Sequence, residues 1–364
     1  MPSLSGWSRC RDVVAFYPEG AAELSAGTTI ITGVTAGIGV ETAKAIAGIG
    51  GRTILAARNS DKAVAVAADI RRIHPHAQVS TCRLDLSSLV SVLDFVDEYR
   101  RRASEEQWPP LKCLVLNAGV ISMAHRVTID GFEETFAVSH LAHFLLATEL
   151  RPELQAAAPS RVVVVSSGSH AGPLATKEVR SASALEAHVV RPSGAGWGLL
   201  KAMQAYGSAK LCNCYMARAI ATKFCDAEGI TACSLHPGTM MATSIGRDSG
   251  LVRFLMRVVL APFTKDMDQG SSTTLTCSLA PHHALAGRFY VDCQPGKYVY
   301  MHMCMHMCIH MCMHMCITTP SPAAFTSTAS LATAWQAQCG SSTALLPHQP
   351  SPPPFTPHLH ISHR

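Results

Sequence analysis

Short apolar runs alternate with amphipathic stretches between residues 28 and 235 of the chain. The apolar runs are rich in β-branched residues and predict strands at 28–32, 52–58, 78–84, 111–116, 161–165 and 231–235. The amphipathic stretches have helical spacing and predict helices at 40–47, 60–73, 88–102, 132–154 and 206–225. Strands that alternate with helices are typical of a parallel sheet with helices on both faces. We therefore predict a single α/β domain with a doubly wound parallel sheet, the Rossmann architecture.

The pattern changes after a seventh predicted strand at 288–292. Residues 301–317 repeat Met, His and Cys, and residues 318–364 are rich in Pro, Ser, Thr, Ala and His, which predicts a disordered tail. We therefore expect an N-terminal extension at 1–27 and one domain at 28–300, followed by the repeat and the tail. The repeat contains ligands suited to copper or zinc. It can also be encoded by an alternating purine–pyrimidine DNA repeat, and we favour that interpretation and predict no metal site.

Composition narrows the class of protein. With 48% hydrophobic residues, 15% charged residues and a net charge of +5, the chain is globular and shows no basic cluster that predicts binding to nucleic acid. It has neither an apolar window of about 18 residues nor the apolar core of a secretory signal, so we expect a cytoplasmic protein. An organelle or a peripheral membrane association is left open. Five of the 14 cysteines lie beyond residue 300, and we expect the others to be reduced packing residues.

Three glycines follow the first predicted strand, in the segment Thr32–Gly39 with sequence TGVTAGIG. A strand, a glycine turn and a helix form a phosphate-binding arrangement, because glycine lets a pyrophosphate approach the backbone and the helix start offers free N–H groups. A glycine turn can also simply reverse the chain. The order of the motifs that follow favours the phosphate site.

Tyr206 and Lys210 lie four residues apart, near the start of a predicted helix. Positions four apart share a helix face, so we expect the ammonium group of Lys210 to lower the pKa of the Tyr206 phenol. Tyr206 would then serve as a proton donor and acceptor at neutral pH. Ser167, at the end of the fifth predicted strand, would hydrogen-bond the reacting oxygen while hydride passes to or from a nicotinamide.

These motifs, with Asn117-Ala118-Gly119 and Pro237-Gly238 in the same order, resemble the short-chain dehydrogenase/reductase family and its retinol-dehydrogenase-like branch. The resemblance runs from Thr28 to Gln294. It implies an NAD(P)-dependent oxidoreductase acting on CH–OH groups. The catalytic residues that it implies are Ser139, Ser167, Tyr206 and Lys210. The cofactor-binding residues that it implies are Thr32, Gly33, Thr35, Gly37, Ile38, Gly39, Asp85, Leu86, Asn117, Ala118, Gly119, Tyr206, Lys210, Pro237, Gly238 and Thr239.

The end of the second strand bears on the choice of cofactor. An NAD enzyme places a carboxylate there for the adenosine ribose, whereas this chain has Ala57 followed by Arg58. A guanidinium group suits a 2′-phosphate, so we predict NADP over NAD, with Arg58 as a cofactor-binding residue.

One position departs from the family pattern. The family usually has an asparagine that helps to hold a relay water where this chain has Ser139, so activity is expected to be weaker. His140 and His143 lie three apart on the same predicted helix. We interpret them as packing and hydrogen-bonding residues, not as metal ligands.

The substrate side is less informative. The apolar segment 251–263 carries two arginines, and it could close over an apolar substrate, pack on the sheet or touch a membrane surface. We expect a small apolar alcohol or carbonyl substrate of retinoid, steroid or lipid type. A homodimer is left open. The alternative function is a weakly active or inactive cofactor-binding scaffold.

Overall fold

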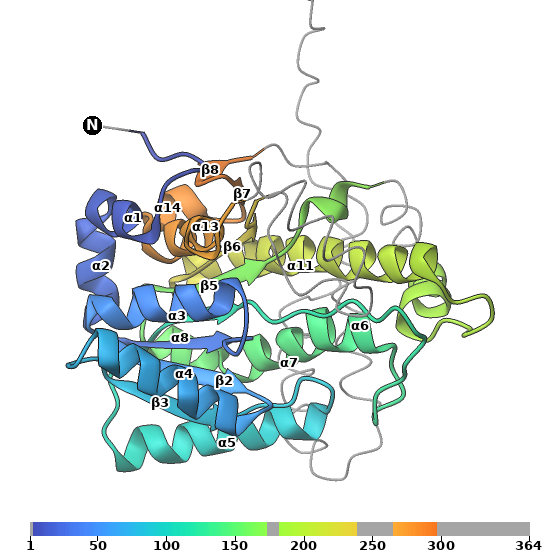
Figure 1. The fold of residues 1–364 in the computed structure, drawn as a ribbon, viewed down its shortest axis with the longest axis horizontal. Helices are drawn as coiled ribbons and strands as arrows, with labels where there is room; N and C mark the ends of the chain where they lie inside the picture. The colour runs from blue at the N-terminus through green and yellow to red at the C-terminus, as the bar shows by residue number, and fades with distance from the viewer. Residues whose placement is uncertain (1–2, 173–181, 239–264, 297–364) are drawn as a thin grey trace, which may run out of the picture.

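The computed structural model describes residues 3–172, 182–238 and 265–296 (Figure 1). The predictions for Thr239, for 251–263 and for the Met/His/Cys repeat and tail lie outside these residues. Within them, the seven predicted strands and one unpredicted strand, β8, form one eight-stranded sheet in the order β3-β2-β1-β4-β5-β6-β7-β8. All neighbouring strands are parallel except β7 and β8, which are antiparallel. The strands are β1 Thr28–Thr32, β2 Arg52–Ala57, β3 Val79–Arg83, β4 Leu111–Leu116, β5 Ser160–Val165, β6 Ile230–His236, β7 Phe289–Val291 and β8 Gln294–Pro295.

Helices cover both faces of this sheet (Figure 1). One face packs against α5 Leu89–Glu105, α7 Ala142–Glu149, α8 Arg151–Ala156 and α11 Leu199–Glu228. The other packs against α1 Cys10–Phe16, α2 Pro18–Ser25, α3 Ile38–Ile49, α4 Ser60–Ile73, α13 Met267–Leu279 and α14 His282–Leu285. Shorter turns are α6 Glu134–Phe136, η1 Ala137–Leu141, η2 Gly168–Ala171, α10 Ala182–Leu185 and η3 Glu186–Val190. The doubly wound fold class is thereby confirmed.

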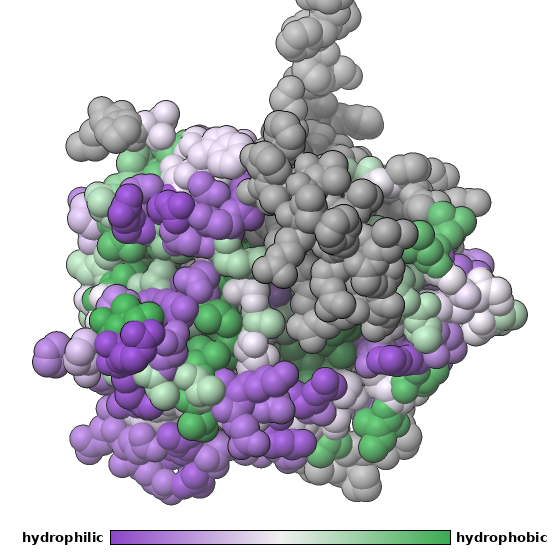
Figure 2. Space-filling view, in the orientation of Figure 1, coloured by the Kyte–Doolittle hydropathy of each residue, from purple (hydrophilic) through white to green (hydrophobic). Residues whose placement is uncertain are grey.

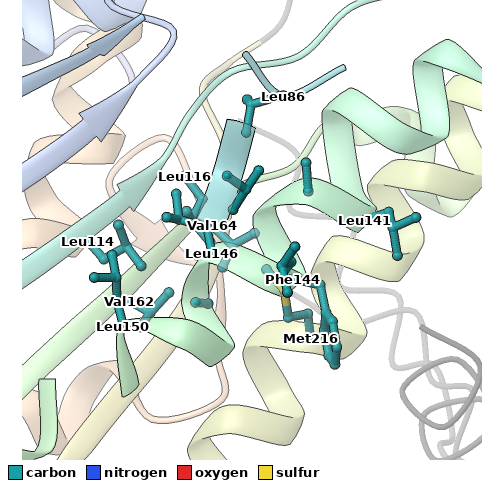
Figure 3. Packing of buried hydrophobic residues seen from close by; sticks show 14 of the residues in the cluster. Leu86, Leu114, Leu116, Leu141, Phe144, Leu146, Leu150, Val162, Val164 and Met216 are labelled. Carbon is teal, nitrogen blue, oxygen red and sulfur yellow. The ribbon is translucent and has the colours of Figure 1, made fainter. Parts of the chain in front are cut away.

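Side chains of the central strands alternate between two buried cores, as parallel strands covered on both faces require. Leu114 and Val162 face the core beside α7 and α11, where Leu146 and Met216 also lie (Figure 3). Val115, their neighbour along β4, faces the opposite core. The cysteines of the described residues are free and almost all buried, so their prediction as packing residues is confirmed.

Two predicted helices differ from the structure. The expected helix at 132–154 is divided at two places. A five-residue π-helical segment, η1, called the π-turn below, separates α6 from α7. A separate helix, α8, begins at Arg151 with Pro152 in its first turn. Proline has no N–H to continue the helix that precedes it, which explains the second break. The helix that carries Tyr206 begins at Leu199, so Tyr206 lies well inside α11 and not near its start.

The N-terminal extension contributes two helices that the hydrophobic pattern did not predict, α1 and α2. Leu4, Val13 and Leu24 are buried in the same core as α3 and α13. At the amino ends of the strands, Arg161 donates to Glu23 of α2 over 2.6 Å. On the solvent side, the surface over α5 is mainly hydrophilic, whereas the surface over α4 is mixed (Figure 2).

Candidate active site

The predicted site residues gather at the carboxyl edge of the sheet. The strand order reverses between β1 and β4, which are neighbours although β2 and β3 separate them in sequence. Ligands of open α/β sheets bind at such a reversal, outside the carboxyl ends of the strands. The glycine turn follows β1, and Asn117 follows β4, so both lie at this point.

Each of the three glycines is needed for a different reason. A Cβ on Gly33 would lie 2.7 Å from the Ala118 Cα, and one on Gly39 would lie 2.2 Å from the Gly33 carbonyl oxygen. Gly37 has a φ of 65° and faces open space. It begins α3, and no described side chain caps this helix start. The N–H groups of the first turn are therefore left for an anion, and the turn fits a dinucleotide pyrophosphate.

Thr32 and Asn117 join the glycine turn to β4. The Asn117 amide Nδ2 donates to the carbonyl oxygens of Thr32 and Gly33 over 2.9 and 3.2 Å. The Thr32 hydroxyl oxygen accepts from the backbone N–H groups of Asn117 and Ala118 over 2.9 and 3.0 Å. Both of its lone pairs are then used, so its hydrogen is free for His143 Nε2, 2.9 Å away.

His143 can accept this hydrogen because its ring is neutral. Burial, and then the positive charge of Lys210, lower the pKa of His143 to about 3. His140 Nδ1 lies 2.9 Å from the Asn213 side-chain oxygen. Both histidines thus make hydrogen bonds inside the fold, as expected.

The predicted adenosine side lies at the ends of β2 and β3. Ala57 is buried and Arg58 is exposed. A carboxylate oxygen of Asp85 accepts from the Ser87 N–H over 3.0 Å, and Leu86 is part of the core. Arg83 is also exposed and pairs in register with Ala57. This second arginine was not predicted from the sequence, although its place at the end of β3 is a signal for it.

Ser167, Tyr206 and Lys210 meet between β5 and α11. Ser167 lies two residues after the end of β5 and caps the turn η2, and its side chain hydrogen-bonds Tyr206. Lys210 is 2% exposed, and its ammonium nitrogen donates to the Val165 carbonyl oxygen over 2.9 Å. The same nitrogen lies 5.6 Å from the centre of the Tyr206 ring.

The electrostatics of this group differ from the expectation. Burial raises the pKa of Tyr206, and the hydrogen bond with Ser167 only partly opposes the rise. The expected lowering by Lys210 is therefore wrong for this structure, in which the ammonium group donates to a carbonyl and lies beside the ring. Burial also lowers the pKa of Lys210 to about 8.

Ser139 lies in the π-turn and is fully buried. Its hydroxyl oxygen accepts from the Val120 N–H over 3.2 Å and lies 3.4 Å from the Val120 carbonyl, to which it donates. A Cβ on Gly119 would lie 3.1 Å from the Lys210 ammonium nitrogen and 3.5 Å from the Ser139 hydroxyl. Ser139 therefore shares one small space with Gly119 and Lys210, and fixes the segment after β4.

Pro237 and Gly238 follow β6 and are buried. A Cβ on Gly238, whose φ is 115°, would lie 2.7 Å from the Lys265 ammonium nitrogen. Lys265 forms an ion pair with Asp292. Among the described residues, no group of three His, Cys, Asp or Glu side chains is placed to hold a metal ion.

Comparison with known proteins places this geometry in a family. The sequence model of the short chain dehydrogenases matches residues 27–185. Retinol dehydrogenase 12 of Mus musculus is 35% identical over 267 residues, which cover 73% of this chain and 77% of that protein. The chain belongs to the short-chain dehydrogenase/reductase family. The family resemblance inferred from the sequence is thereby confirmed.

Other members of the family are also similar to this chain. WW domain-containing oxidoreductase of Danio rerio is 40% identical over 273 residues, 74% of this chain and 63% of that protein. The chain thus spans a little under two thirds of the length of this relative. A Burkholderia cenocepacia short chain dehydrogenase, solved in complex with NADP, has the same fold, with a TM-score of 0.56 and 20% identity over 74% of this chain and 97% of that chain. Among the described residues, no helix is long and apolar enough to cross a bilayer.

Proposed function

We propose that this protein is an NADP-dependent oxidoreductase that interconverts an alcohol and a carbonyl on a small apolar substrate. The observation that carries the proposal is the meeting of Ser167, Tyr206 and Lys210 beside the glycine turn. These residues come from β5 and α11, and the fold brings them to the edge where dinucleotides bind in such sheets.

The bound nicotinamide supplies or accepts the hydride, and the protein handles the proton. Ser167 and Tyr206 hydrogen-bond each other, so both hydroxyl groups can contact one substrate oxygen. In the direction of reduction, Tyr206 donates its proton to that oxygen, and its raised pKa keeps the proton available at neutral pH. In the direction of oxidation, the phenolate form of Tyr206 accepts the proton from the substrate hydroxyl, with the Lys210 ammonium 5.6 Å from the centre of its ring.

The preference for NADP is supported by charge at the adenosine side. Arg58 and Arg83 are exposed at the ends of neighbouring strands, and Ala57 occupies the position where a carboxylate selects NAD. A guanidinium group binds a 2′-phosphate with charged, bidentate hydrogen bonds. The relatives named retinol dehydrogenase favour an apolar substrate for this chain as well.

Replacement of Tyr206 by phenylalanine tests the proposal. The variant keeps the ring and lacks the proton, so NADPH-linked turnover of retinoid, steroid and aliphatic aldehydes should fall at least about 1,000-fold while NADPH still binds. Retained turnover would contradict the assignment of Tyr206. A wild-type protein that binds NADPH and turns over none of these carbonyls would favour a cofactor-binding scaffold, the alternative that Ser139 suggests.

A further inference from the structure

Asn213 is a fully buried residue that the proposed reaction does not yet use. It lies on α11, three residues after Lys210. Its amide nitrogen donates to the carbonyl oxygens of Ser139 and Val165 over 3.0 and 3.3 Å. These two carbonyls fix the orientation of the amide, so the side-chain oxygen faces His140 Nδ1 at 2.9 Å. Because an amide oxygen only accepts, that ring nitrogen carries the hydrogen.

The carbonyl of Val165 is shared between Asn213 and Lys210. The Lys210 ammonium nitrogen donates to it over 2.9 Å and the Asn213 amide over 3.3 Å. A carbonyl oxygen has two lone pairs, so these two donors saturate it. The ammonium group is then directed by one fixed acceptor, and its other hydrogens are left for the side of Gly119 and Ser139.

The second carbonyl ties this arrangement to the π-turn. The Ser139 hydroxyl accepts from the Val120 N–H and donates to the Val120 carbonyl. The backbone carbonyl of Ser139 accepts from the Asn213 side-chain amide. One amide thus connects the end of β5, the helix that carries Lys210 and the π-turn. π-Turns inside helices are frequent at functional sites, where they displace backbone groups from the regular helical pattern.

We propose that Asn213 is a positioning residue for the reaction, which holds the Val165 and Ser139 carbonyls so that the Lys210 ammonium is fixed beside Tyr206. This inference rests on the proposed function. Asn213 itself does not touch the reacting atoms. It acts through Lys210, and this distinguishes it from a buried amide that only stabilises the fold.

A double-mutant cycle between Asn213 and Lys210 tests the inference. Asn213→Leu removes both donated hydrogen bonds, and the one accepted from His140, without adding charge. We expect it to lower kcat by about 10- to 100-fold in the protein with Lys210, and by less than about twofold in the Lys210→Met protein. Steady-state oxidation of NADPH at saturating carbonyl substrate gives kcat, and NADPH fluorescence gives Kd in the same four proteins. Losses of equal size in both backgrounds would overturn the inference.

Two further variants separate positioning from stability. Asn213→Ser keeps a small polar side chain with one donor, so the cycle is repeated with it should the leucine variant fail to fold. Ser160→Ala is the matched control. Ser160 is buried at the amino end of β5, the end of that strand away from the site, and its hydroxyl donates to the Leu154 carbonyl over 2.7 Å. The control should lower the unfolding temperature and keep kcat within about twofold.

The cycle also distinguishes failure of this inference from failure of the proposed function. A wild-type protein that binds no NADPH would contradict the proposed function. If the wild-type protein binds NADPH but shows no turnover, the double-mutant cycle is evaluated from the Kd for NADPH. Asn213→Leu should then weaken NADPH binding only when Lys210 is present. Additive changes in Kd would overturn the inference alone.

Discussion

Replacement of Lys210 by methionine tests whether the candidate active site lowers the stability of the fold. Burial lowers the pKa of Lys210 from 10.5 to about 8, and the side chain is only 2% exposed. This gap corresponds to a cost of about 3 kcal/mol for keeping the ammonium charged in the folded protein. Methionine has a similar length and no charge, but it loses the charged hydrogen bond to the Val165 carbonyl, worth about 1.5 kcal/mol. We therefore expect Lys210→Met to raise the free energy of unfolding by about 1.5 kcal/mol at pH 7.

The gain should depend on pH in a defined direction. Below pH 8 the lysine is charged in both the folded and the unfolded chain, so the full cost is present. Between pH 8 and 10.5 the folded lysine loses its proton first, and the cost falls as pH rises. By pH 9.5 about 2 kcal/mol of it is gone, so the variant and the wild type should then be about equally stable.

Denaturation by urea at pH 7 and pH 9.5, without added dinucleotide, measures both values. Lys62→Met, at an exposed position of α4, is the control for loss of a lysine that is not buried. A stability difference that is the same at both pH values would refute the reasoning. So would a Lys210→Met protein that is less stable than the wild type at pH 7.

Three other predictions concern the cofactor, the π-turn and the N-terminal helices. Arg58→Ala should weaken NADPH binding by about 10- to 100-fold and leave NADH nearly unchanged, and equal losses in titrations with both would contradict a 2′-phosphate contact. Ser139→Asn should raise kcat by a fewfold if the serine weakens the relay, and an unchanged or lower kcat would show that the site is adapted to serine. Burial alone would raise the pKa of Glu23, but a hydrogen bond with His282 and the charge of Arg161 lower it from 4.5 to about 2. Glu23 is only partly buried, so solvent screens the pair, and Glu23→Gln should lower the free energy of unfolding by about 1 to 2 kcal/mol at pH 7. This loss should disappear as pH falls from 4.5 to 2, and a loss independent of pH in denaturation experiments would contradict the ion pair.

The strands could be predicted because central parallel strands are almost continuously apolar. The helix α13 could not, since its sequence is rich in serine and threonine although it is buried from Gly270 to Leu279. Ser271 and Ser278 satisfy their hydroxyl groups by donating to Met267 and Thr274 carbonyls one turn earlier in the same helix. A buried helix of this kind has no apolar stripe, so hydrophobic periodicity does not detect it.

The candidate site could be predicted where its residues follow strand ends, because topology alone brings such positions together. The glycine turn, Asn117 and Ser167 belong to this class. Asn213 was missed because its role depends on which carbonyls face it, although its place three residues after Lys210 on one helix face was a signal. The pKa of Tyr206 was predicted in the wrong direction, because the sequence showed the neighbouring charge and not the burial.

Asn213 and Ser139 together explain how this site can differ from the family pattern without losing its geometry. The hydroxyl at position 139 holds only the Val120 backbone, at 3.2 and 3.4 Å, and both distances are long for a hydroxyl group. The carbonyl at the same position is held separately, by the Asn213 amide. The Lys210 ammonium is oriented by the Val165 carbonyl and not by the Ser139 side chain. A serine at position 139 therefore affects the position of the segment after β4 more than it affects the position of the ammonium group. The weaker activity expected from Ser139 would then arise in the segment around Gly119 that its hydroxyl holds, where the proposed ribose site lies, and would appear in cofactor affinity before it appears in proton transfer.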